Sequence, residues 1–111
     1  MSERIETTAI RNLIHNEEYC RKVLPFIKEE YFTDRLEKLI FTEIYGFVNK
    51  YNNLPTKESL SIEMNTNKGV SEGEYKKMNE IISSLNPEPI NLDWLVETTE
   101  TWCKDRAIHN A

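Results

Sequence analysis

The sequence predicts an all-α protein, folded as a compact bundle of about six helices. Apolar residues recur at helical spacing through each long segment, and no long stretch alternates as a strand would. Only 3 glycines and 4 prolines interrupt the helical pattern. A length of 111 residues favours one domain with a modest hydrophobic core.

The first predicted helix covers residues 3–15, where apolar side chains repeat on one stripe. Asn16 is placed to cap a second helix, because its side chain can accept a hydrogen bond from a free backbone N–H of the first turn. Pro25 lies within the apolar repeat of that second helix. Two outcomes are open there, since the helix either kinks at the proline or stops at Leu24.

The helix that follows Asp34 carries the longest amphipathic pattern. Asp34 is its predicted N-cap, with Glu37 at the capping-box position. Its apolar face comprises Leu36, Leu39, Ile40, Ile44, Phe47, Val48 and Tyr51. Phe41 lies off the centre of that face. Gly46 in mid-helix costs about 1 kcal/mol relative to alanine, which predicts the close approach of a neighbouring element.

Two shorter helices follow. Pro55 holds the preceding residue extended, so Thr56 is expected to cap a helix that runs to about Met64. Ser71 and Glu74 have capping-box spacing and begin another helix, with apolar residues in phase as far as Leu85.

The last predicted helix follows a stiff linker at residues 86–89. It starts at Asn91, and its apolar stripe includes Trp102 and Cys103. No stop signal precedes Ala111, an ending more typical of a fragment than of a natural terminus.

Composition and charge disfavour several classes of function. The chain has 14 basic and 19 acidic side chains, a net charge of −5, whereas proteins that bind DNA alone normally show a basic face. No apolar run approaches the roughly 20 residues of a membrane span. The N-terminus lacks a signal-peptide pattern, so we expect a cytosolic protein. Cys20 and Cys103 fall on apolar stripes, which favours buried thiols over a disulfide.

The sequence predicts no catalytic, cofactor-binding or metal-binding residue. Its glycines cannot form the phosphate-binding loop of nucleotide hydrolases. His15 and His109 lack partners at zinc-ligand spacing. His15 is expected to face the negative end of a helix. A nucleophile pair of Cys20 and His15 is possible only in principle, because their spacing does not enforce contact.

Three motifs occur in order along the chain. They are Glu30-Tyr31-Phe32 between two helices, Ile40-Phe41 in the long helix, and Leu54-Pro55-Thr56 after it. With these motifs the chain resembles the N-terminal domain of DnaB-type hexameric replicative helicases, although the histidine that usually precedes the Ile-Phe pair is missing. The resemblance is closer still to the replicative helicases of T-even-like bacteriophages, through the stretches Tyr19–Pro25, Val48–Tyr51 and Trp94–Glu100.

This resemblance implies a longer protein that unwinds duplex DNA with ATP and Mg²⁺, both bound by a C-terminal ATPase domain absent from this chain. The domain itself would not be an enzyme. It would form part of a hexamer collar, contact neighbouring subunits and primase, and work in the cytoplasm of the bacterial host. Residues 1–86 would form a helical head, and residues 91–111 the first helix of a hairpin.

Two groups of residues are candidates for an interface. Trp102, Arg106 and Ile108 on the last helix would face the second helix of that hairpin. Glu72, Glu74 and Glu80 form an acidic stretch that is a candidate for docking a basic partner such as primase. An ordinary solvated helix face is the alternative interpretation of the acidic stretch.

Other functions remain open. Composition and periodicity fit a stand-alone helical adaptor or regulatory protein, with no helicase attached, equally well. A helical nucleic-acid binder is disfavoured by the acidic charge.

Overall fold

The computed structural model describes residues 4–66 and 69–109, and these residues form six α-helices and one short 3₁₀ helix. In chain order they are α1 (Ile5–His15), α2 (Glu17–Val23), η1 (Glu29–Tyr31), α3 (Arg35–Tyr51), α4 (Lys57–Asn65), α5 (Glu72–Ser84) and α6 (Leu92–His109). No strand occurs among the described residues. The predicted all-α fold is therefore confirmed, whereas the predicted helix limits at residue 3 and Ala111 lie outside the described residues.

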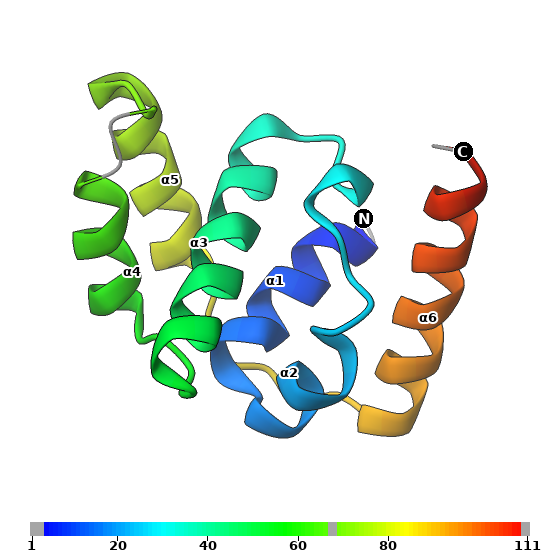
Figure 1. The fold of residues 1–111 in the computed structure, drawn as a ribbon. Coiled ribbons are helices and arrows are strands. Elements are labelled where there is room, and N and C mark those ends of the chain that lie inside the picture. Colours follow the sequence, from blue (N-terminus) through cyan, green and yellow to red (C-terminus); the bar gives the residue numbers. More distant parts are fainter. Residues whose placement is uncertain (1–3, 67–68, 110–111) are drawn as a thin grey trace.

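The helices are arranged around α1 and α3 (Figure 1). The α4–α5 pair packs against α3, on the side of the molecule opposite α6. Helix α6 packs against α1, α2 and η1. The two helices that carry the predicted interface residues, α5 and α6, therefore lie at opposite edges of the bundle.

Side-chain caps start five of the helices where the sequence predicts them. In each case a side-chain oxygen accepts a hydrogen bond from a backbone N–H of the first turn, which would otherwise lack a partner. The capping residues are Asn16, Asp34, Thr56, Ser71 and Asn91. At Ser71 the reciprocal bond from its own N–H to the Glu74 carboxylate is also present, so the predicted capping box is confirmed.

Pro25 marks the end of α2. The helix closes at Val23, with Leu24 as its C-cap. Of the two outcomes that the sequence left open, the helix stops rather than kinks. The proline ring and its missing N–H prevent the helical backbone hydrogen bonds from continuing.

The predicted capping box at Asp34 is wrong. The Asp34 carboxylate does accept from the N–H groups of Leu36 and Glu37. The Glu37 side chain, however, turns into the bundle, where it accepts hydrogen bonds from the Arg4 guanidinium at 2.7 Å and the Thr7 hydroxyl at 2.9 Å. A buried carboxylate needs such partners, and Glu37 thereby fastens the start of α1 to α3.

The apolar face of α3 also differs from the predicted face. Phe41 is only 3% exposed, whereas Tyr51 is 46% exposed and rests on Phe47 at a ring-centroid distance of 4.7 Å. The neighbour predicted at Gly46 is not present among the described residues, because a Cβ built there would meet no atom within 4 Å apart from its chain neighbours and the backbone of α3 itself. Gly46 instead lies on the exposed surface of α3.

An aromatic cluster joins η1, α3 and α6. The ring centroid of Phe32 lies 5.1 Å from that of Phe41 and 5.1 Å from that of Trp102, and Tyr31 meets Trp102 edge to face. Such pairs contribute about 0.5–1.5 kcal/mol each beyond the area that they bury. The geometry of the corner after α2 is thus set by side chains from three separate segments.

Candidate interaction surfaces

Trp102 lies in the core and does not face outward from α6. Its side chain is 8% exposed and packs on Tyr31 and Phe32. The expectation that its ring faces a helix outside the head is therefore wrong. The indole Nε1–H has no hydrogen-bond acceptor among the residues that the structure describes, so within them the ring contributes packing but no hydrogen bond.

Arg106 and Ile108 lie in contrasting surroundings near the end of α6. Arg106 is half-buried, and its Nε–H, like the Trp102 indole one turn earlier, has no acceptor among the described residues. Ile108 is 73% exposed. Trp94, at the other end of the helix, is 53% exposed, although the sequence did not single it out as an interface residue. A role for these side chains in binding stays a prediction.

Two exposed apolar side chains, Trp94 and Ile108, lie on the outer face of α6. Trp94, Thr101 and Ile108 are spaced seven residues apart and are all exposed. A seven-residue spacing keeps side chains on nearly the same face of a helix. This face points away from α1, α2 and η1, the elements that α6 packs against.

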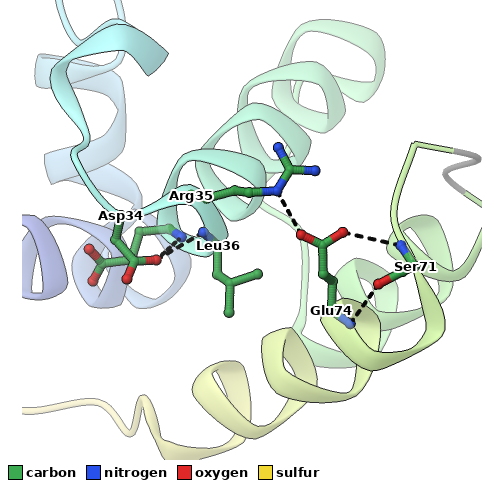
Figure 2. A network of polar contacts seen from close by, with 6 residues as sticks. Asp34, Arg35, Leu36, Ser71 and Glu74 are labelled. Carbon is green, nitrogen blue, oxygen red and sulfur yellow. Dashed lines mark hydrogen bonds and ion pairs between the residues drawn. The ribbon is translucent and has the colours of Figure 1, made fainter.

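Glu74 is already engaged within the molecule. Figure 2 shows its carboxylate between Arg35, at the start of α3, and Ser71, at the start of α5. The Arg35 Nε–H donates to it at 2.6 Å, and the Ser71 backbone N–H donates at 3.3 Å. The hydrogen bond from Arg35 holds the pKa of the Glu74 carboxyl below its usual range. Glu74 therefore links two helices.

Glu72 and Glu80 remain exposed on α5, but their surface is not uniformly acidic. Lys76 lies midway between them at intervals of four residues, so all three side chains share one helix face. Together with Tyr75 and Asn79 they line a shallow depression. A positive charge at its centre weakens the attraction that this face would exert on a basic partner.

The cysteine, histidine and tyrosine side chains that often take part in catalysis include four that are buried or hydrogen-bonded in this structure. Burial raises the pKa of the Cys20 thiol to about 11 and that of Cys103 to about 12. Both cysteines are free and buried, as predicted. The His15 ring nitrogen Nε2 lies 2.7 Å from the Leu85 carbonyl oxygen, so the imidazole bridges α1 to the end of α5. Burial likewise raises the pKa of Tyr19, whose hydroxyl bonds to that of Thr99 at 2.7 Å.

The described residues contain neither a candidate metal site nor a candidate membrane-spanning helix. Among them, no three His, Cys, Asp or Glu side chains gather closely enough to hold a metal ion. Within the same part of the chain, no helix combines the length and apolar character needed to cross a membrane.

A surface that the sequence did not identify lies along α3. Two adjoining cavities, of about 400 Å³ and about 350 Å³, lie beside α3. The larger one separates α3 from α2, and the smaller one separates it from the segment that joins α2 to η1. Both are lined by Pro25 and Tyr45, and Tyr45 is 43% exposed. The sequence signal that pointed to this region was Gly46, which suggested a close neighbour that the described chain does not supply.

The chain is related in sequence to a viral helicase. No model of a known protein family matches it. It is 33% identical, over 102 residues, to a DnaB-like replicative helicase of Enterobacteria phage T4. The alignment covers 92% of this chain and 21% of the relative, so the chain spans about a fifth of the length of that helicase. The resemblance that the motifs predict is confirmed: this all-helical chain is related to part of the DnaB-like replicative helicases.

Proposed function

We propose that this chain is a non-catalytic N-terminal domain of a phage replicative helicase. The observation that carries the proposal is 33% identity to such a helicase across 92% of the chain. In the complete protein, a separate motor domain would bind ATP and Mg²⁺ and unwind DNA in the host cytoplasm. This domain would serve assembly of the homo-hexamer and contact with primase.

The contacts of the polar side chains support a non-catalytic role. His15 is bonded to a backbone carbonyl, the carboxylate of Glu37 to Arg4 and Thr7, and the thiol of Cys20 is kept protonated by burial. A general base or nucleophile needs a suitable protonation state and an open position for substrate. Here the imidazole and the carboxylate are occupied by structural contacts, and the thiol is not ionised.

We further infer that α6 is the first helix of a hairpin whose second helix covers Trp94 and Ile108. Both side chains are more than half exposed on the face of α6 that points away from the head. The two side chains are separated by Thr101, so the inference rests on their shared helix face together with the similarity to the helicase. A reading frame that continues past Ala111 into a further helix supports this inference, whereas a stop codon at that point favours the stand-alone adaptor.

Deletion of the domain tests the proposed function. Removing residues 1–111 from the complete helicase should abolish stimulation of primer synthesis by primase while single-stranded DNA still stimulates ATP hydrolysis. The ATPase measurement controls for folding of the motor domain. Stimulation of primase that survives the deletion would show that the partner role is wrong.

Catalytic activity of the isolated chain is measured separately. We expect ATP hydrolysis and strand separation at the level of the buffer control. Hydrolysis that co-purifies with the folded chain would overturn its assignment as a non-catalytic domain.

A further inference from the structure

A trough made of two adjoining cavities follows α3 on the exposed surface. The two cavities beside this helix share Pro25 and Tyr45, so they meet at those two side chains. One cavity extends to Leu54, beyond the end of α3, and the other to Thr42, near its start. From Thr42 to Tyr51, where α3 ends, a helix rises about 14 Å, which is roughly two and a half helical turns.

The floor of the trough is apolar on both sides of Tyr45. Leu24, Val48 and Leu54 line the half near the end of α3. Ile27 and Phe41 line the other half. Apolar floors of this kind, divided by one exposed aromatic ring, suit two apolar side chains from a docked helix.

Gly46 adds an independent observation at the edge of the trough. Its helical neighbours Thr42 and Asn49, one turn away on either side, both line the cavities. Apart from its chain neighbours and the backbone of α3 itself, no atom of the described chain lies within 4 Å of a Cβ built at Gly46. Glycine weakens the middle of a helix, and no contact within the described residues accounts for it here. A backbone that approaches from outside would account for it.

The charge at one end of the trough indicates which residue a partner would place there. Helices α2 and α3 both end at this point, with Leu24 and Asn52 as their C-caps, and both caps line the cavity. The C-terminus of a helix carries partial negative charge. Glu17 and Arg21 at the rim already pair with each other at 2.7 Å, so they cancel. Lys22 and Lys50, in the last turns of the same two helices, do not line the cavity. The groups that line this end of the trough therefore favour a cation.

We propose that this trough docks an amphipathic helix of a partner protein. The helix would place one apolar side chain on each side of Tyr45 and a Lys or Arg against the C-termini of α2 and α3. The inference rests on the proposed docking role of the domain and identifies the surface that binds the partner. A second copy of this chain and an acidic segment are the competing occupants, and binding and sedimentation measurements distinguish both.

Peptide binding followed by NMR tests the trough. The probe is a helical peptide of about 14 residues, roughly four turns, with leucines on one stripe and lysines at one end. A matched peptide carries glutamates in place of the lysines. We expect amide shifts at residues that line the trough, and affinity at least about tenfold weaker for the glutamate peptide. Equal binding of both peptides, shifts elsewhere, or no shift at millimolar peptide would overturn the proposal.

Two glycine variants distinguish an effect on docking from an effect on folding stability. Gly46→Gln and Gly73→Gln each replace an exposed helical glycine whose Cβ direction is open. Both should raise the midpoint of thermal unfolding, because glutamine is the better helix former. Only Gly46→Gln should weaken lysine-peptide binding, by about tenfold. Unchanged binding by Gly46→Gln, or an equal loss in Gly73→Gln, would contradict the assignment.

Three further outcomes identify a wrong occupant or a wrong role. If the chain alone sediments as a dimer that Gly46→Gln dissociates, a second copy occupies the trough and the partner helix is excluded. If deletion of residues 1–111 uncouples primase but Gly46→Gln in the complete helicase does not, the docking role stands and the trough is the wrong face. If the peptide binds as predicted but the deletion has no effect, the trough stands and the primase role fails.

Discussion

Trp102 and Trp94 lie on the same helix but in opposite surroundings. Trp102 is 8% exposed within the aromatic cluster, whereas Trp94 is 53% exposed on the outer face of α6. The free energy of unfolding depends on how much apolar surface and packing a side chain contributes, so truncating the two tryptophans should have different consequences.

Trp102→Ala should lower the free energy of unfolding by about 3–5 kcal/mol, because it removes a buried ring and leaves a cavity between η1 and α6. Trp94→Ala should change it by no more than about 0.5 kcal/mol. Urea denaturation followed by circular dichroism measures both values. Equal losses for the two variants would show that Trp102 is not the ring that fastens α6 to the head.

The two thiols should be unreactive in the folded chain. Burial raises the pKa of Cys20 to about 11, so roughly a thousandth of it is thiolate at pH 8, and less of Cys103. Iodoacetamide at pH 8 should therefore label neither cysteine in native buffer and both in urea, as read by mass spectrometry. Rapid native labelling of Cys20 would mean that α2 moves enough to expose this thiol, which lines the cavity between α2 and α3.

The helix starts could be predicted from sequence, because caps and capping boxes depend on residues within one turn. Asn16, Thr56 and Ser71 each cap the helix that they were expected to cap. Two other features could not be predicted. Glu37 bonds to Arg4, which lies 33 residues earlier, and the space beside Gly46 depends on how whole helices pack.

The Arg35–Glu74 contact makes the junction of α3 and α5 dependent on pH. The pKa of the Glu74 carboxyl is lowered in the folded chain by the hydrogen bond from Arg35. Its stabilising contribution is therefore complete above the unfolded pKa of about 4.3 and is lost as pH falls through the lower folded pKa. Both side chains remain open to solvent, so the effect is small.

Glu74→Gln should accordingly be less stable than the native chain at pH 7, and the difference should shrink as pH falls from about 5 to about 2. Urea midpoints across that range measure it. Glu80→Gln is the matched control, since its carboxylate is exposed and lies on the same helix. If the difference for Glu74→Gln grew toward low pH, the carboxylate would not be the form that stabilises the junction.

At the scale of the whole molecule, two surfaces are candidates for binding a partner. The outer face of α6 carries exposed apolar residues at both ends, and the trough along α3 has an apolar floor with a negatively polarised end. The sequence predicted interface residues on α6 from the family resemblance. It could not identify the trough, because that surface exists only where α3 packs beside the turn at Pro25, which comes from a different segment.

The acidic stretch on α5 shows a related limit of sequence reasoning. Glu72, Glu74 and Glu80 are close in sequence, yet Arg35, 39 residues before Glu74, engages one of them, and Lys76 lies between the other two. Charge counted along a segment includes Lys76, which lies within it, but not Arg35, which folding brings to it from another helix. A docking role for this stretch stays a prediction.

Competition by the isolated domain tests most directly whether this chain docks a replication partner for a replicative helicase. Excess purified residues 1–111 should reduce helicase-stimulated primer synthesis in a concentration-dependent manner, while DNA-dependent ATP hydrolysis by the helicase stays unchanged. Trp102→Ala, which should unfold or loosen the domain, is expected to lose this inhibition. Primer synthesis that remains at full rate in the presence of a large excess of the folded domain would contradict the docking role.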